Sequence, residues 1–207
     1  MSTPQTLLDI AREIKSIAQS GLAYAENAFD QERYMRLRDL AGTLLSSEPR
    51  YEDFQWPVEL GYPTPKLDVR GVVLQGNEIL LVKEASTGAW TLPGGWADVN
   101  YTPAENVERE VREETGYEVR AERIISLIDR NRSDYPPHPD YIYKLFFLCT
   151  LCGGKAQTSI ETEAVGFFNV DSLPVLDRGR TNTRDIRRAV QAHGDSALPT
   201  YFEKSAS

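Results

Sequence analysis

The feature that most constrains the fold of this chain is a glycine turn followed at once by a strongly acidic helix. Pro93-Gly94-Gly95 predicts a tight turn whose backbone can approach a ligand closely, because glycine has no side chain. Thr102-Pro103-Ala104-Glu105 predicts an N-terminal capping box, and Gly116 predicts a left-handed end to the helix. The strand-like segment Trp90-Thr91-Leu92 therefore leads through a turn into a helix that ends near Thr115.

Three carboxylates lie on one stripe of this expected helix, at Glu110, Glu113 and Glu114. Like charges at these spacings cost an isolated helix roughly 0.3 kcal/mol per pair, and a solvated acidic face is their plainest explanation. Their combination with the preceding strand, glycine turn and helix cap indicates instead a site for a hard divalent cation, which takes oxygen ligands and binds alongside substrate phosphates.

The charge balance points to the same segment. The 207 residues carry a formal net charge of −8, and residues 98–118, with seven acids and two arginines, carry −5 of it. This balance argues against general DNA binding, because phosphate contacts require a basic face, but it allows a phosphate-containing substrate when metal ions mediate the contact. His138 and His193 are the only histidines, and neither stands in a pattern typical of a Ser-His-Asp hydrolase or a zinc site.

Composition narrows the class of protein further. With 26% charged and 41% hydrophobic residues the chain has a soluble globular composition, and its length allows one core or one core with a small appendage. Two cysteines cannot form a disulfide framework, so we expect a cytoplasmic location. The longest apolar run, residues 145–149, is too short to cross a bilayer, and no signal-peptide pattern opens the chain.

Two helical segments open the chain. Ser2-Thr3 and Pro4 predict an N-terminal cap, apolar residues over 7–18 recur at helical spacing, and Gly21 predicts the end of the first helix. A second helix is expected to start at Asp30. Two helices cannot bury both apolar stripes alone, so the rest of this chain or a second subunit must cover them.

The remainder of the chain predicts a mixed sheet. Residues 46–65 are expected to form an ordered connector, since four prolines interrupt regular structure while Tyr51, Phe54 and Trp56 favour packing. Strands are expected at 67–75, 78–84, 117–129, 141–151 and 164–169, the first two joined by a hairpin turn at Gly76-Asn77, and a helix over 183–193. This order predicts an α/β fold with a helical N-terminal region and connector over 1–65 and a second domain over 66–207.

Residues 95–117 resemble the Nudix box, written G-x5-E-x7-R-E-U-x-E-E-x-G-U with U a bulky apolar residue. The matching positions are Gly95, Arg109, Glu110, Val111, Glu113, Glu114, Gly116 and Tyr117. Tyr101 stands where the pattern has its first glutamate, which leaves the number of metal ions open unless Asp98 or Glu163 compensates. The N-terminal helices, the segment GGWADVN and the closing helix also resemble one Nudix subgroup, the hydrolases of nucleoside diphosphates linked to another moiety.

The resemblance implies a fold and an activity. The fold would be the Nudix α/β/α sandwich with a mixed sheet, preceded by the helical N-terminal region. The activity would be metal-dependent hydrolysis of a nucleoside diphosphate-X, of the CDP-choline or ADP-ribose type, to a nucleoside monophosphate and phosphorylated X. The expected cofactor is Mg²⁺ or Mn²⁺, and the subgroup suggests a homodimer formed through the N-terminal helices.

The roles of site residues follow from the matching positions. Glu110 and Glu114 match the family's principal metal ligands, and Glu113 matches a further ligand or base. The Gly94 carbonyl would complete the metal site. Arg109 matches a residue that orients these glutamates through ion pairs.

Three further candidates lie outside the matching positions. Glu163 is expected in the loop before strand 164–169, and the resemblance implies a candidate general base there, since such loops supply the base in several Nudix enzymes; a solvated loop acid is the alternative. Trp96 and Asp98 directly follow the glycine turn and are candidate substrate-binding residues, although Trp96 could equally pack against the sheet.

Other interpretations stay open beside these. A nucleoside triphosphate or RNA 5′-end pyrophosphohydrolase would use the same metal site with a different base pocket. A catalytically weak nucleotide-binding module would explain Tyr101, but a pure binder has no need of Glu110, Glu113 and Glu114 together. A local basic cluster, most simply a solvated helix face and otherwise a contact for phosphate or RNA, consists of Arg178, Arg180, Arg184, Arg187 and Arg188.

Overall fold

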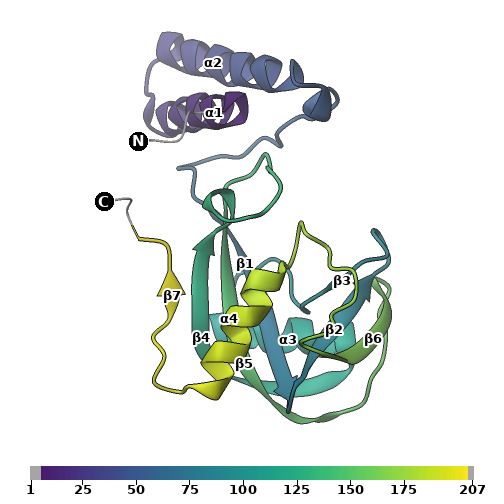
Figure 1. Ribbon diagram of the computed structural model, residues 1–207. Coiled ribbons are helices and arrows are strands. Elements are labelled where there is room, and N and C mark those ends of the chain that lie inside the picture. Colours follow the sequence, from purple (N-terminus) through teal and green to yellow (C-terminus); the bar gives the residue numbers. More distant parts are fainter. Residues whose placement is uncertain (1–5, 205–207) are drawn as a thin grey trace. The chain divides into compact units, whose positions relative to one another are not determined.

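The computed structural model describes residues 6–204. The chain divides into two compact units, which Figure 1 shows. The first is the N-terminal part of the chain up to Pro65 and includes His138–Tyr141, where the Tyr141 ring centroid lies 5.9 Å from the guanidinium carbon of Arg12. The second begins at Lys66 and comprises the rest.

The first unit is a pair of helices followed by an ordered connector. Helix α1 covers Leu7–Tyr24, α2 covers Ala28–Ser46, and a short 3₁₀ helix covers Pro49–Tyr51. Leu8, Ala11, Leu45 and Tyr51 form a small buried core between them. The rings of Tyr51, Phe54 and Trp56 pack edge to face, which confirms that this connector is ordered.

The ends of these helices differ from the sequence prediction. Helix α1 begins at Leu7, because Thr6 and Asp9 form its capping box; the predicted cap at Ser2-Thr3 and Pro4 lies outside the described residues. Gly21 does not end α1. A side chain there would meet the Tyr34 ring of α2 at 2.3 Å, so this glycine allows the two helices to approach closely. Helix α2 begins at Ala28 rather than Asp30, since Asn27 accepts the Asp30 N–H.

The second unit contains a sheet and two helices. Its strands within the described residues are β1 (Lys66–Gln75), β2 (Glu78–Glu84), β3 (Trp90–Thr91), β4 (Tyr117–Asp129), β5 (Ile142–Gly154), β6 (Thr162–Asn169) and β7 (Tyr201–Phe202). Its α-helices are α3 (Pro103–Thr115) and α4 (Thr183–Gly194), and a 3₁₀ helix covers Arg130–Arg132.

Strand β1 lies at the centre of this mixed sheet. It pairs in parallel with β5 over eight residues and forms an antiparallel hairpin with β2. On one side β5 pairs antiparallel with β4, which pairs in parallel with β7; on the other, β2 pairs antiparallel with both β3 and β6. The predicted mixed sheet is therefore confirmed.

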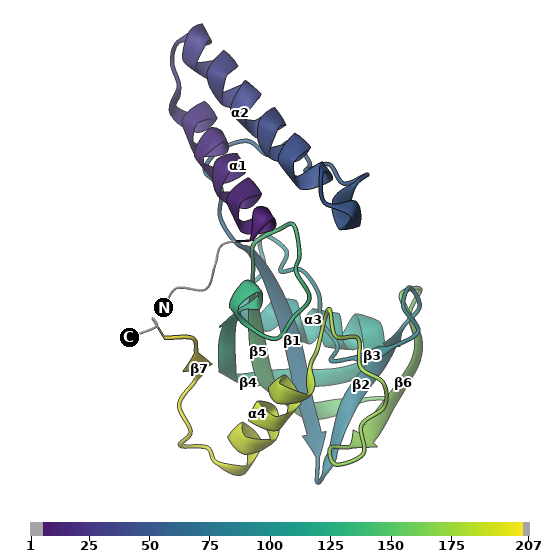
Figure 2. The same cartoon turned by 45° about the horizontal axis from the view of Figure 1, so that its top comes forward.

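The two helices cover opposite faces of β1. Val69 and Val73 pack in one core with Val107 and Val111 of α3, whereas Val72 packs in the other core with residues of α4. In the two cartoon views α4 lies on the near side of β1 and α3 on the far side (Figure 1, Figure 2). This arrangement is the expected α/β/α sandwich.

Most element boundaries agree with the sequence prediction to within three residues. Two differ in ways that matter. The sequence did not predict β7, whose two residues are exposed at the sheet edge. Strand β6 begins at Thr162, because Thr162 pairs with Glu84 of β2, so Glu163 lies within a strand and not in the loop before it. In residues 6–204, no helix has the length and apolar character needed to traverse a bilayer.

Candidate active site

Helix α3 has the predicted caps at both ends. The Thr102 side chain accepts the Glu105 N–H, and the Glu105 carboxylate accepts the Thr102 N–H at 2.7 Å. At the other end Gly116 adopts φ 73°, a left-handed conformation that favours glycine. The start and the end of α3 are thus set by signals local to the segment.

The glycine turn runs alongside β1. The Gly71 N–H donates to the Pro93 carbonyl at 2.9 Å, and the Val69 N–H donates to the Gly95 carbonyl at 2.8 Å. Gly94 has φ 136°, and a Cβ atom there would lie 2.1 Å from the Val69 carbonyl oxygen. Only glycine fits at position 94, because the backbone of the turn lies so close to β1. The close backbone approach that the sequence predicted for this turn is therefore made to the sheet.

Glu114 is the acid of α3 that lies deepest. Its Oε2 accepts the Gly94 N–H at 2.9 Å, and its side chain is almost fully buried. Burial raises the pKa of Glu114 to about 7, although the Arg70 guanidinium and the Gly94 N–H oppose that rise. The backbone carbonyl of Glu114 accepts the Thr162 hydroxyl at 3.1 Å, which ties this turn of the helix to β6.

Arg109 connects the other acids. Its Nη2 donates to Asp98 at 2.6 Å and to Glu110 at 3.3 Å, and its Nη1 lies 3.9 Å from Glu113. Burial raises the pKa of Glu110, while Arg109 acts in the opposite direction. Glu113 is the most exposed of the three glutamates, with 54% of its side chain accessible. Arg109 therefore gathers three carboxylates around its guanidinium group.

The donor chemistry of this group suits a hard divalent cation, since carboxylate and backbone carbonyl oxygens are its usual ligands. A Cβ atom on Gly95 would lie 2.7 Å from Glu110 Oε2, so glycine at this position keeps that oxygen accessible. The described residues, however, contain no group of three or more His, Cys, Asp or Glu side chains already gathered for metal binding. Glu110 is held by Arg109 and Glu114 by Gly94 instead.

Comparison with known proteins identifies the family of this chain. The model of the NUDIX domain matches residues 64–190, which include the whole sheet core, the glycine turn and α3. The chain belongs to the Nudix family. A second model, the UDP-X-like N-terminal oligomerisation domain, matches residues 5–51.

Several relatives of this Nudix protein span most of its length. A putative ADP-ribose pyrophosphatase of Bacillus subtilis is 41% identical over 183 residues, covering 86% of this chain and 88% of the relative. The crystal structure of a UDP-X diphosphatase is 30% identical, with a TM-score of 0.64, and covers 95% of this chain and 98% of that one. An ADP-ribose pyrophosphatase from Streptococcus suis is 39% identical, with a TM-score of 0.63, over 68% of this chain and all of the other.

Tyr101 replaces the first glutamate of the Nudix box with an aromatic ring. The guanidinium carbon of Arg109 lies 4.9 Å from the centroid of that ring, within the range of a cation–π interaction. The loop that carries Tyr101 is fixed by Asn106, whose side chain accepts the Asp98 N–H at 2.8 Å and donates to the Asp98 carbonyl at 3.1 Å. Asp98 thus supplies a carboxylate to Arg109 from this loop.

The candidates outside the Nudix helix have more varied surroundings. Glu163 is half exposed and forms an ion pair with Lys83 at 2.9 Å. Trp96 is 48% exposed, forms an isolated bridge with Asp68, and has its ring 5.9 Å from the Lys66 ammonium. The structure thus brings Glu110, Glu113 and Asp98 together at Arg109, with Glu114 bonded to Gly94. The side chains of Glu163 and Trp96 instead lie beside Lys83 and Lys66.

A buried ionic network behind the Nudix turn was not predicted from the sequence. Arg70 donates to both oxygens of Asp68 at 2.8 Å and to the Leu92 carbonyl at 3.1 Å, and Lys144 donates to Asp68 at 2.9 Å. Burial acts to raise the pKa of Asp68, but Arg70 and Lys144 outweigh it and lower that pKa to about 2. The network fixes the carbonyl that directly precedes the glycine turn.

A second unpredicted acid, Glu84, lies at the end of β2. It is 3% exposed, with Arg180 at 3.2 Å, and burial raises its pKa.

The sequence held one signal of the buried network, namely charged residues within apolar strands, at Asp68, Arg70 and Lys144. Residues that are charged yet placed in buried strands are rarely unpaired, so their partners could have been sought.

Proposed function

We propose that this Nudix protein is a metal-dependent pyrophosphohydrolase of nucleoside diphosphates linked to another moiety, of the ADP-ribose or CDP-choline type. The observation that carries the proposal is the convergence of Glu110, Glu113 and Asp98 on Arg109, beside a turn that holds Glu114 at Gly94. The names of the Bacillus subtilis and Streptococcus suis relatives and of the UDP-X diphosphatase support this substrate class.

Glu110, Glu114 and Glu113, with the Gly94 carbonyl, would hold the Mg²⁺ or Mn²⁺. When bound, such an ion neutralises diphosphate charge and lowers the pKa of a coordinated water. In the hydrolysis a water oxygen would attack one phosphorus while the bond from that phosphorus to the bridging oxygen breaks, which would give a nucleoside monophosphate and phosphorylated X. The protein's task is to orient these carboxylates and to accept the proton that the water loses.

Arg109 serves as the positioning residue in this proposal, because its ion pairs fix Glu110 and Asp98. Glu113 or Glu163 accepts the proton from water. Trp96 and Asp98 lie directly after the glycine turn and contact the substrate, Trp96 through its half-exposed ring.

A product assay tests the substrate class. The protein is incubated with ADP-ribose, CDP-choline, NADH, UDP-sugars or nucleoside triphosphates, each with Mg²⁺ or Mn²⁺, and products are separated by chromatography. We expect a nucleoside monophosphate from the linked diphosphates and little turnover of triphosphates. Nucleotide binding without hydrolysis of any compound would instead support the binding module.

Substitution of Glu163 tests the identity of the base. Glu163→Gln is expected to lower kcat by at least roughly a hundredfold while leaving the Mn²⁺ affinity unchanged, because a base acts on the proton and not on the metal. The matched control is Glu161→Gln, an exposed acid two residues earlier. Unchanged turnover in Glu163→Gln would assign the base to Glu113.

We also propose that the helices α1 and α2 mediate homodimerisation. The family model that matches residues 5–51 describes an oligomerisation domain. Several large apolar side chains on these helices are exposed, namely Ile10, Ile17, Tyr24, Phe29, Met35, Leu37 and Leu40. Such a concentration of exposed apolar side chains is typical of a protein–protein interface.

A further inference from the structure

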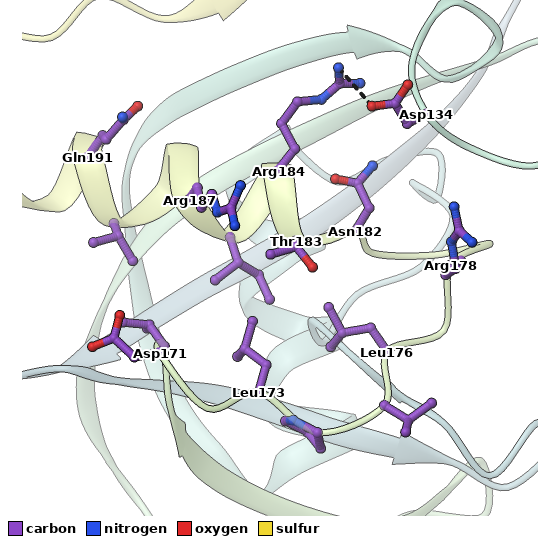
Figure 3. Close-up of a pocket in the computed structure, with 15 residues that line it drawn as sticks. Asp134, Asp171, Leu173, Leu176, Arg178, Asn182, Thr183, Arg184, Arg187 and Gln191 are labelled. Atoms are coloured by element: carbon purple, nitrogen blue, oxygen red, sulfur yellow. Dashed lines mark ion pairs between the residues drawn. The ribbon is translucent and has the colours of Figure 1, made fainter.

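The unit that contains the sheet has a concave region that is distinct from the α3 site. It is a groove of about 1000 Å³ between α4 and residues 170–178, the segment that leads from β6 toward α4 (Figure 3). Among the described residues, its lining includes none from α3 or from the glycine turn. A ligand in this groove would therefore contact a different set of side chains from those assigned to hydrolysis.

The floor of the groove is apolar. Leu173, Leu176 and Val190 line it and are partly buried against the core cluster that contains Ile186, which lines it too. One wall is fixed by the sheet, since the Trp90 N–H donates to the Val175 carbonyl at 2.9 Å. The groove is thus preorganised, so a ligand would lose little free energy in ordering it.

The arginines near α4 divide into two groups. Arg180 is paired with Glu84 at 3.2 Å and Arg184 with Asp134 at 3.0 Å, and Arg188 lies 3.9 Å from Asp185. In contrast, Arg178 and Arg187 are exposed and make no ion pair or hydrogen bond with the described residues. Both of these unpaired arginines line the groove, Arg187 from the helix and Arg178 from the opposite segment (Figure 3).

The acids that face the groove offset only part of the positive charge. Asp134 is already paired with Arg184, and Asp171 accepts a hydrogen bond from the Asn77 amide at 3.0 Å. The charged lining is therefore three arginines against two aspartates, in a chain whose net charge is −8. The lining of the groove therefore carries a net positive charge, although the net charge of the whole protein is negative. It presents two guanidinium groups that have no ion-pair partner among the described residues, beside an apolar floor.

We propose that this groove is a binding site for a phosphorylated small molecule with an apolar or aromatic body. The apolar or aromatic body of the ligand packs on Leu173, Leu176 and Val190, and its phosphate binds Arg178 or Arg187. A guanidinium suits this role because its planar fork donates two parallel hydrogen bonds to a phosphate. This second site is independent of the hydrolytic reaction proposed for α3.

Calorimetric titration with UMP, and separately with inorganic phosphate, tests this site. EDTA is present throughout, so that no divalent ion can hold phosphate at the α3 carboxylates. UMP is expected to bind more tightly than inorganic phosphate, because only UMP can cover the apolar floor. The double variant Arg178→Gln/Arg187→Gln is expected to bind UMP at least about tenfold more weakly.

Two controls separate this site from the alternatives. Arg120→Gln removes one positive charge, at an exposed arginine of β4, and Glu110→Gln alters the α3 site; both should bind UMP like the unmodified protein. The proposal is overturned if the unmodified protein binds no UMP at about 10 mM. It is equally overturned if Arg120→Gln weakens binding as much as the double variant, or if only Glu110→Gln does.

Discussion

At the scale of single residues, Arg109 is the centre of the candidate active site. Its guanidinium contacts Asp98, Glu110 and Glu113, and its Nε is buried without a hydrogen-bond acceptor. The Tyr101 ring lies beside it where the Nudix box has a glutamate. The ring attracts the guanidinium cation of Arg109 without adding a further negative charge. Arg109 therefore keeps its position although the glutamate of the Nudix box is replaced.

Substitution of Tyr101 tests this role. Tyr101→Leu is expected to lower kcat/KM by roughly tenfold, because an Arg109 that is no longer held by the ring orients Glu110 less well. Tyr101→Phe keeps the ring and should retain nearly full activity. Steady-state kinetics with the preferred substrate measure both, and Val99→Ala on the same exposed loop is the control. Equal activity of the Leu and Phe variants would contradict the role of the ring.

The Asp68 carboxylate is expected to be the most important single charge for stability. Asp68→Asn leaves Arg70 and Lys144 buried without a counter-charge, which should cost about 3 kcal/mol or more of the free energy of unfolding. The pKa of Asp68 is lowered from its usual value to about 2 in the folded protein, so its contribution is complete above about pH 4 and is lost as the pH falls toward 2.

Urea unfolding of the Asp68→Asn variant and the unmodified protein measures this difference. The gap between them should be widest near neutral pH and should narrow as the pH is lowered from 4 to about 2. Asp98→Asn, whose carboxylate is mostly exposed, should change stability by less than about 0.5 kcal/mol. A gap for Asp68→Asn that stays constant with pH would show that its charge is not the cause.

At the scale of elements, the two adjacent glycines of the turn are expected to matter in different ways, Gly94 for the stability of the fold and Gly95 for activity. Gly94→Ala places a Cβ atom 2.1 Å from a backbone oxygen of β1 at a φ of 136°, and should destabilise the fold by about 3 kcal/mol. Gly95→Ala places its Cβ 2.7 Å from the mobile end of Glu110, which can shift. Its stability should therefore change by less than about 1 kcal/mol.

The activity, in contrast to the stability, should be sensitive to the substitution of Gly95. Gly95→Ala displaces the Glu110 carboxylate and is expected to lower kcat by at least about tenfold in a fully folded protein. Thermal unfolding and kinetics, measured on the two variants side by side, distinguish these effects. Full activity of Gly95→Ala would show that Glu110 tolerates the displacement.

Elements with complete local signals were predicted well, and those that depend on distant partners were not. Helix α3 carries its cap, its apolar side and its terminal glycine within one segment, so the sequence predicted both ends. Gly21 looked like a terminal glycine, but its role is set by Tyr34 on the next helix. The pairing of Asp68 with Lys144 joins residues 76 apart on neighbouring strands, which no local pattern reveals.

At the scale of the whole molecule, the assembly state is the first property to measure. Ile17→Glu and Leu40→Glu place charges on exposed apolar positions of α1 and α2 and should shift a dimer toward monomer in sedimentation. Thr43→Glu, at an exposed polar position of α2, is the matched control and should remain dimeric. A monomer in the unmodified protein at all concentrations would remove the dimer proposal.

The parallel pairing of β1 with β5 also fixes the order in which the protein can mature during synthesis. Residues 93–117, which carry the glycine turn and the acidic helix, leave the ribosome well before Ile142–Gly154. Until β5 arrives, Asp68 and Arg70 lack Lys144 and β1 lacks its central neighbour. Because such long-range pairings form late, a nascent chain can already contain all of residues 95–117 and still lack the strand pairing that supports the candidate active site.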